Sequence, residues 1–442
     1  MKQYCIIGGG PTGLSLAYVL AINGYRVILI EKDTQLGGSW NQTWIEDKYF
    51  SENSPRVFMK TPYVTQLLKA IGIKNTDLES VYGPYFTIKM IKFMYQHFTI
   101  LDWLLFMIYF IIYKINTTLN ITVQNWLDTS GLSLLGKKAI KIICILLCDR
   151  PDKTNVVNFF GQLGLGGNLE QFKKPNLWHK LIKDKLDKLS TVTLYLSTEA
   201  ISIHQQNEKI NKIKCKQNKK HFEINCDRLF LCCQSNNIAP LLKNSDTLVK
   251  NNWNSFKWIQ KWCQKTYYSG FGFQLHFDEL VTFPDDWCWS CSGDWTVIIL
   301  PVSKWLTTIS KDPKVKTVWS CCIVDMETKS NRTNKTPNES TKEEVIEECL
   351  FQIKNSYQIP KPYKITTSVD LSNKNNKWES KKTGWTRGTY GYLPMKGKIS
   401  NLFALGSFTE QNFHNVATFG LSVQSTVKYL QKYEKVNIVS KR

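Results

Sequence analysis

Three glycines near the N-terminus have the spacing of a phosphate-binding turn. Gly8, Gly10 and Gly13 form the pattern G-x-G-x-x-G, with Pro11 and Thr12 between the second and the third. In such a turn the first glycine permits a tight bend, the second lets the backbone approach a pyrophosphate, and the third lets helix and strand pack closely. A helix that begins here points free N–H groups and partial positive charge at the phosphates. The pattern therefore predicts a dinucleotide site.

The segments around this turn predict a β-turn-α-β unit. Tyr4–Ile7 reads as a short apolar strand, the helix runs through Ala21, and Arg26–Glu31 reads as a second buried strand. The unit takes about thirty residues, which is the length that such a unit requires. Glu31 is placed to accept hydrogen bonds from a ribose diol, and an acid here disfavours the 2′-phosphate of NADP. We count the neighbouring Lys32 among the cofactor-binding residues.

A second pair of glycines distinguishes FAD from NAD. The sequence LGGSW, which ends in Gly38, Ser39 and Trp40, comes a few residues after Glu31. It resembles the extended fingerprint of flavoproteins of the glutathione-reductase structural class, which plain NAD dehydrogenases lack. Taken alone, the pair would be interpreted as an ordinary glycine-rich loop.

Passages farther along the chain resemble one known superfamily. Gly161–Gly167, the helix after it and Val192–Leu196 resemble a passage of flavin amine oxidases, in which the position of Ala200 lies against adenine. Asn401–Phe408 and Thr418–Ser425 resemble the closing strand, turn and flavin-facing helix of the same proteins. The superfamily is that of flavin-containing amine oxidases, protoporphyrinogen oxidases and phytoene desaturases.

This resemblance implies an α/β fold with a Rossmann-like FAD-binding domain, in which a parallel sheet with helices is accompanied by a second small sheet. The FAD-binding domain is expected in three parts, residues 1–85, 161–250 and 386–442. An α+β substrate domain is expected from helices in residues 86–160 and from a sheet and a helix in residues 251–385. Residues 41–85 show no clear periodicity and are expected to be irregular.

The resemblance also implies that Gly406, Ser407 and Thr418 contact the flavin. FAD is expected to be bound non-covalently, because no cysteine follows Cys349 to attach it near the closing glycine. The family usually has an acid where this chain has Ser407, and a basic residue where it has Ser39. Both departures remove polar contacts to the cofactor.

The implied activity is that of an FAD-dependent oxidoreductase, with hydride transfer to the flavin from an amine or from a C–C or C–N bond of a lipophilic molecule. Trp385, Tyr390 and His414 are candidates for the cavity wall, while the catalytic residues are not indicated and no metal site is expected. One alternative is a flavin-dependent monooxygenase, although residues 164–167 lack the third glycine of the NADPH motif that this class needs. The other is a degenerate flavoprotein fold with a binding or structural role, which Ser39 and Ser407 favour.

Composition indicates a folded, basic protein. The 442 residues are 43% hydrophobic and 13% aromatic, and the formal net charge is +21. The lysines are scattered along the chain, which makes a nucleic-acid partner unlikely. The 13 cysteines often lie in apolar runs, and the first residues do not read as a signal peptide. These features favour the cytoplasm or another reducing compartment.

Residues 98–113 are almost continuously apolar, with Asp102 as the one interruption. The run is shorter than the roughly 20 residues that a bilayer span needs. We expect a buried helix in the substrate domain. The alternative is a helix that makes peripheral contact with a membrane or walls a lipid-sized pocket. The expected partner is a small lipophilic or amine substrate, and the sequence indicates no oligomeric state.

Overall fold

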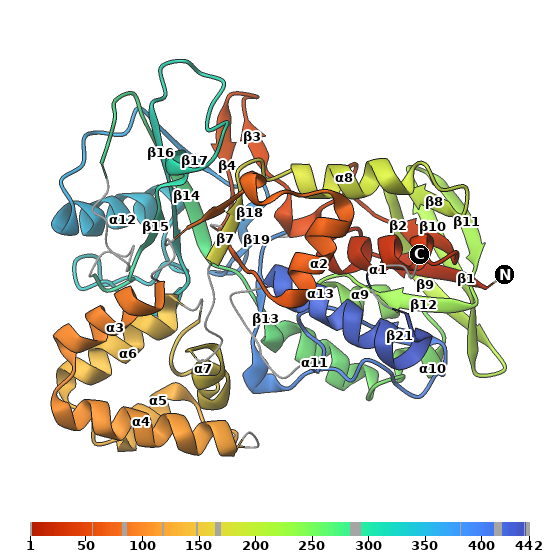
Figure 1. Ribbon diagram of the computed structural model, residues 1–442, viewed down its shortest axis with the longest axis horizontal. Coiled ribbons are helices and arrows are strands. Elements are labelled where there is room, and N and C mark those ends of the chain that lie inside the picture. Colours follow the sequence, from red (N-terminus) through yellow and green to blue (C-terminus); the bar gives the residue numbers. More distant parts are fainter. Residues whose placement is uncertain are drawn as a thin grey trace.

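The computed structural model describes residues 2–54, 56–81, 86–116, 119–146, 149–163, 169–282, 293–380, 382–410, 418–436 and 438. Figure 1 shows three regions: a Rossmann-like domain that contains the N-terminus, a second domain built on an antiparallel sheet, and a lobe of helices below that sheet.

A five-stranded parallel sheet forms the centre of the Rossmann-like domain. Its order is β21 (Leu402–Ala404), β12 (Arg228–Leu231), β1 (Gln3–Ile7), β2 (Arg26–Ile30) and β8 (Val192–Tyr195), and each neighbouring pair is parallel. The strands are apolar at almost every position because both faces of the sheet are covered. The predicted Rossmann-like α/β fold is confirmed.

Alternate residues of each strand enter two different cores. Tyr4 and Ile6 of β1 pack against helices on one face, whereas Cys5 and Ile7 pack on the other. The helices on the first face are α1 (Pro11–Ile22), α2 (Pro62–Ile71), α8 (Leu177–Leu186) and α13 (Thr418–Tyr429). The second face carries the small sheet β9 (Thr198–Gln206), β10 (Lys209–Gln217) and β11 (Lys220–Asn225), together with α9 (Ile238–Leu242), α10 (Thr247–Lys250) and α11 (Phe256–Thr266).

The second domain is built on a four-stranded antiparallel sheet. Its order is β15 (Ile298–Leu300), β16 (Thr317–Ile323), β14 (Phe271–Phe277) and β17 (Lys364–Thr367), and the apolar face of α12 (Lys342–Ser356) joins its core. The short pair β13 (Tyr267–Tyr268) and β20 (Trp385–Thr386) connects this domain to the parallel sheet.

The expectation that residues 41–85 are irregular is wrong. They contain β3 (Thr43–Ile45), β4 (Tyr49–Ser51), β5 (Phe58–Met59), α2 and β6 (Leu78–Ser80). Helix α2 has a local signal, since the Thr61 side chain accepts a hydrogen bond from the Val64 N–H and Pro62 occupies the first helical position. Strands β3 and β4 pair with each other as a local hairpin. Strands β5 and β6 have no local signal, because they form by pairing with the distant β7 (Leu169–Phe172).

The helical lobe contains α3 (Phe86–His97), α4 (Ile100–Ile115), α5 (Val123–Thr129), α6 (Leu134–Leu146) and α7 (Val156–Leu163). Its core is aromatic, and Phe106 and Tyr113 of α4 pack on Phe160 of α7. The expectation that the apolar run 98–113 is a buried helix is wrong for one face, because eight apolar side chains of α4 are exposed. In the part of the chain described here, no helix is both long and apolar enough to cross a membrane.

Asp102 is buried and joins the start of α4 to the start of α6. One oxygen accepts hydrogen bonds from Thr99 N–H and Thr99 Oγ1, both at 2.9 Å, and from Ser133 Oγ at 2.6 Å. The other oxygen accepts the Ser133 N–H at 2.6 Å. Together with the Thr99 hydroxyl, Asp102 completes a capping box at the N-terminus of α4.

Replacing Asp102 should therefore destabilise the lobe. Asp102→Ala removes a charged cap and leaves buried donors without an acceptor, which costs about 1–3 kcal/mol. Thermal denaturation followed by circular dichroism should show a clearly lower midpoint. Asp128→Ala is the control, since Asp128 is exposed and accepts a bond from Gln124 Nε2. Equal midpoints for the two variants would contradict this role of Asp102.

Candidate dinucleotide-binding site

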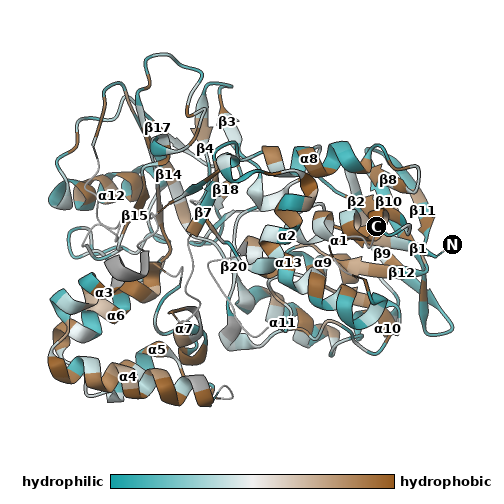
Figure 2. Ribbon diagram, in the orientation of Figure 1, coloured by the Kyte–Doolittle hydropathy of each residue, from teal (hydrophilic) through white to brown (hydrophobic). Residues whose placement is uncertain are grey.

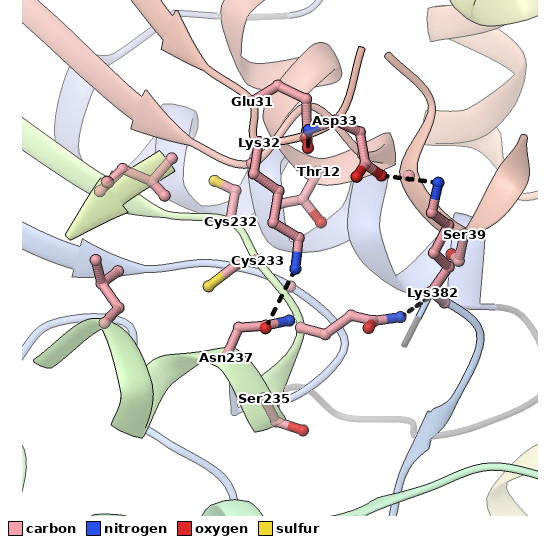
Figure 3. A pocket seen from close by; sticks show the side chains of 18 of the residues that line it. Thr12, Glu31, Lys32, Asp33, Ser39, Cys232, Cys233, Ser235, Asn237 and Lys382 are labelled. Carbon is pink, nitrogen blue, oxygen red and sulfur yellow. Dashed lines mark hydrogen bonds and ion pairs between the residues drawn. The ribbon is translucent and has the colours of Figure 1, made fainter. Parts of the chain in front are cut away.

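A long cavity of about 300 Å³ opens at the carboxyl ends of β1, β2 and β12 and continues to β20 and β21. Ligands of open α/β sheets bind at such strand ends. Figure 3 shows side chains of its wall, with Glu31 and Lys32 on one side and Asn237 and Lys382 across the opening. Twelve of the residues proposed from sequence line it: Gly8, Gly10, Pro11, Thr12, Glu31, Lys32, Gly38, Ser39, Trp40, Ala200, Gly406 and Ser407.

The glycine turn is shaped by two close approaches. A Cβ on Gly13 would lie 1.8 Å from the carbonyl oxygen of Gly8, so only glycine lets α1 pack this near the end of β1. Gly13 therefore supports the cavity from behind and does not line it. A Cβ on Gly38 would lie 3.1 Å from the Cα of Gly10, so the two glycine loops touch.

Glu31 holds the first glycine turn against the segment that follows β2. One carboxylate oxygen accepts the N–H of Gly9 at 2.6 Å, and the other accepts the N–H of Asp33 at 2.9 Å. Burial raises the pKa of Glu31, although both N–H groups favour the charged form. Each oxygen keeps a second lone pair, with which Glu31 can accept a hydroxyl of a ribose.

The start of α1 has the features of an anion site. No side chain caps its first turn, which begins at Gly10 and contains no acidic residue. Its N–H groups are therefore available to phosphate oxygens. Ser235 Oγ is buried in the cavity wall and has no hydrogen-bond partner among the described residues. The cavity thus offers donors and acceptors of the kinds that a dinucleotide needs.

The far end of the cavity reaches the second domain. It is lined by Tyr267 of β13, by Gly384 and Thr386 beside it, and by the turn after β21. That turn is held by α13, because the hydroxyl of Ser425 accepts the N–H of Gly406 at 3.0 Å. Ser407 Oγ lies 3.5 Å from Thr386 Oγ1. The cavity therefore extends well past the helix N-terminus at which a pyrophosphate would be bound.

Several lining residues were missed by sequence reasoning. Lys382 Nζ pairs with Asp33 at 3.1 Å, and the Lys382 carbonyl accepts Gln234 Nε2 at 2.6 Å. Across the same opening, Lys32 Nζ donates to Asn237 Oδ1 at 3.5 Å. These contacts join segments that are far apart in the chain, so no local pattern predicted them.

The other proposed residues lie elsewhere. Trp385 is buried and stacks on Tyr268 with ring centroids 5.4 Å apart, next to the cavity-lining Thr386. Tyr390 lies beneath Lys265, with Nζ 5.5 Å from its ring centroid. Thr418 begins α13, but its side chain, His414 and residues 164–167 lie outside the described part of the structure.

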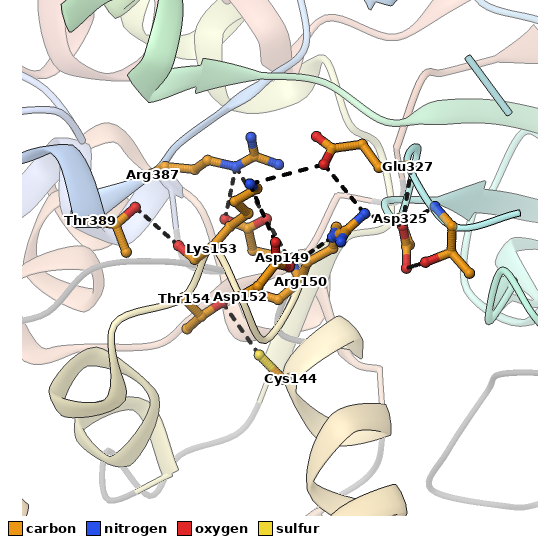
Figure 4. Close-up of polar contacts among 11 residues, drawn as sticks. Cys144, Asp149, Arg150, Asp152, Lys153, Thr154, Asp325, Glu327, Arg387 and Thr389 are labelled. Atoms are coloured by element: carbon orange, nitrogen blue, oxygen red, sulfur yellow. Dashed lines mark hydrogen bonds and ion pairs between the residues drawn. The ribbon is translucent and has the colours of Figure 1, made fainter. Parts of the chain in front are cut away.

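A charged network connects the cavity wall to the helical lobe (Figure 4). Arg387 follows Thr386, and its Nε lies 3.2 Å from both carboxylate oxygens of the buried Asp149. Its guanidinium also lies over the ring of Tyr268, 4.3 Å from the centroid. Beside Asp149, Arg150 pairs with Asp325 of the second domain at 3.2 Å. The three regions of the molecule therefore meet next to the far end of the cavity.

Comparisons with known proteins agree with this geometry. Residues 6–71 match the family described as NAD(P)-binding Rossmann-like domain. An L-amino-acid oxidase from Sistrurus catenatus edwardsii is 32% identical over 92 residues, which are 21% of this chain and 18% of that protein. A glycerol-3-phosphate dehydrogenase [NAD(P)+] from Halothermothrix orenii is 42% identical over 48 residues, 11% of this chain and 14% of the dehydrogenase. The matches thus span less than a fifth of each relative.

Solved structures match nearly the whole chain. An oxidoreductase from Methanosarcina mazei superposes with a TM-score of 0.63 at 13% identity, covering 96% of this chain and 100% of that one. Cyclohexylamine oxidase from Brevibacterium oxydans superposes with a TM-score of 0.58 at 11% identity, covering 98% and 99%. The chain has the amine oxidase fold. At this identity the likeness establishes the fold, and the amine oxidase fold is the one that the sequence resemblance predicted.

Two glycine substitutions should distinguish an effect on cofactor binding from an effect on the stability of the fold. Gly10→Ala should fold normally, because the nearest atom to its Cβ is the Gly38 Cα at 4.0 Å. It should nevertheless weaken dinucleotide binding by about tenfold or more, since the methyl group occupies the approach to the phosphates. Gly13→Ala should impair both, because α1 must move away from Gly8. Thermal denaturation and cofactor titration check this, and unchanged binding by Gly10→Ala would contradict the placement of the pyrophosphate.

His179 should make the fold sensitive to acid. It lies beside the second glycine loop, where a Cβ on Gly37 would be 2.9 Å from its ring. Burial and the charge of Arg56 lower the pKa of His179 to about 4 from an ordinary value of 6.5. The folded protein therefore binds fewer protons than the unfolded chain between these values, and its stability falls as the pH falls.

Urea denaturation gives the free energy of unfolding of the wild type and of His179→Gln. The amount by which the wild type exceeds the variant should be smaller at pH 5 than at pH 7. His221→Gln, which replaces an exposed histidine of β11, is the control for the change of side chain itself. A constant difference for His179→Gln would show that this histidine is not held in its neutral form.

Proposed function

We propose that the protein is an FAD-dependent oxidoreductase of the amine oxidase type. The observation that carries this proposal is the reach of the cavity, which runs from Glu31 past the glycine turn to the turn at Gly406 and Ser407. An adenosine and a pyrophosphate fill only the first part of such a cavity. The second part lies where the parallel sheet meets β13 and β20, and there a flavin ring can face a substrate held by the second domain.

The residues of the chain fit this cofactor in named places. The N–H groups at the start of α1 would hold the pyrophosphate, and Glu31 would hold the ribose next to adenine. Trp40, Tyr267 and Thr386 would enclose the flavin end and exclude water. FAD, when bound, supplies the hydride acceptor, so the protein contributes position, dryness and charge.

The proposed substrate is an amine or a lipophilic molecule with a C–C or C–N bond to oxidise. The structural relatives support an amine, since one of them is named as a cyclohexylamine oxidase. The aromatic pair Tyr268 and Trp385 lies directly beside the far end of the cavity and supports an apolar substrate.

A degenerate flavoprotein is the second candidate, favoured by Ser39 and Ser407. Both residues line the cavity, and both stand where the family usually has a charged anchor for the cofactor. Ser407 can still form one hydrogen bond. Weak binding of FAD, without turnover, would follow if these contacts were essential.

The test is to purify the protein with added FAD, remove the excess, and record the visible spectrum. The expected result is the twin-banded spectrum of a flavin that denaturation releases. Amines, porphyrinogens and polyenes would then be added without oxygen, and one of these classes should bleach the flavin. A flavin that none of them reduces would favour the degenerate candidate. A protein that binds no FAD would contradict the oxidoreductase and leave the degenerate fold with a binding or structural role.

Ser407→Asp gives a matched test of the flavin end. Restoring an acid beside Thr386 should tighten FAD binding by about tenfold, which corresponds to one strong hydrogen bond. ADP-ribose, which lacks the flavin, should bind both proteins equally. An equal effect on the two ligands would place the flavin elsewhere.

A further inference from the structure

The outer face of α4 is apolar at every exposed position whose side chain the structure describes. Ile100, Leu104 and Ile115 expose 82%, 59% and 79% of their surface. Every exposed side chain that the structure describes on this helix is Ile, Leu or Met: Ile100, Leu101, Leu104, Met107, Ile108, Ile111, Ile112 and Ile115. Their spacing of three and four residues places them on one face.

The opposite face of α4 is already packed. Phe106 and Tyr113 are buried against Phe160, and Tyr109 packs on Trp126. An α-helix that is apolar all round is normally buried on every side or embedded in lipid. Here one side lies on the aromatic core of the lobe, and the other lies along the outer edge of the molecule (Figures 1 and 2).

The beginning of α6 extends this face. Asp102 holds Ser133 against the first turn of α4, and the next two residues, Leu134 and Leu135, are 85% and 59% exposed. We call the eight side chains of α4 together with Leu134 and Leu135 the apolar face of the lobe. It is built from two helices, and the hydrogen bonds of Asp102 hold the starts of these helices together.

Positive charge flanks the apolar face. Lys138 and Lys141 are exposed, and they lie one and two turns beyond Leu134 on the same side of α6. Residues 86–146 contain six Lys and two Asp, with no Arg or Glu, a net charge of four. One of the two acids, Asp102, is buried and already hydrogen-bonded.

We propose that the apolar face of the lobe docks on an anionic phospholipid surface, with the apolar side chains of α4 in the acyl boundary and the lysines of α6 at the headgroups. Apolar burial and attraction to anionic lipid together give stable interfacial binding. A second copy of the chain fits less well, because pairing through this face brings two positively charged lobes together.

The test is co-sedimentation of the FAD-loaded protein with vesicles. Vesicles of phosphatidylcholine with phosphatidylserine should carry the protein down, and vesicles of phosphatidylcholine alone should carry far less. Ile108→Glu should reduce the bound fraction by about tenfold or more, because it places a charge in the acyl boundary. Ile111→Glu, one turn away, should do the same, and circular dichroism should show both variants folded.

Two control variants make the same kinds of substitution outside the apolar face of the lobe. Leu280→Glu alters an exposed leucine, 82% accessible, three residues after β14, and this variant should bind like the wild type. Lys138→Gln with Lys141→Gln should weaken binding to the anionic vesicles. The matched pair Lys219→Gln with Lys220→Gln, at the exposed hairpin between β10 and β11, should not.

Three results would overturn the proposal. In the first, the wild type stays in the supernatant with both kinds of vesicle. In the second, both glutamate variants sediment as the wild type does. In the third, the wild type forms a dimer that Ile108→Glu dissociates, without binding vesicles. That last outcome would assign the face to a second copy of the chain.

Discussion

The approach of α1 to the end of β1 is the contact on which the candidate site depends. Gly13 packs against the carbonyl of Gly8. This close packing determines the direction of the N–H groups in the first turn of α1. Two further connections hold the turn in place: Glu31 accepts the Gly9 N–H, and the Gly37 N–H donates to the Gly9 carbonyl at 2.8 Å. Three segments therefore meet within a few ångströms at the carboxyl edge of the sheet. A larger residue at position 13 would displace all three at once.

The far end of the cavity depends on long-range pairing. Tyr267 lines it because β13 pairs with β20, which aligns Tyr267 with Thr386. The turn at Gly406 lies there because β21 pairs with β12 and because Ser425 of α13 holds its backbone. The Asp149–Arg387 ion pair then attaches the helical lobe beside the same place. Changes in the lobe can thus reach the cavity wall through a short chain of buried contacts.

These two kinds of contact explain what could be predicted from sequence. The glycine turn, its strands and Glu31 follow from a local pattern, since spacing and residue type determine the unit within about thirty residues. Ser235, Lys382 and Tyr267 carry no such signal, because only the folded chain brings them to the cavity. The apolar run of α4 shows a further limit. Periodicity identifies a helix, but it cannot say which face has a partner when both faces are apolar. Helix α2 differs from these cases, because Thr61 and Pro62 are a local signal for a helix start.

We propose that the cavity binds a dinucleotide and that its far half recognises the flavin. Calorimetric titration of the cofactor-free protein with FAD, NAD and ADP-ribose tests it most directly. All three ligands share the adenosine and the pyrophosphate, so any difference in affinity comes from the far half of the cavity. FAD should bind at least about a hundredfold more tightly than ADP-ribose, a difference of about 2.7 kcal/mol. Equal affinities, or tightest binding of NAD, would contradict this proposal.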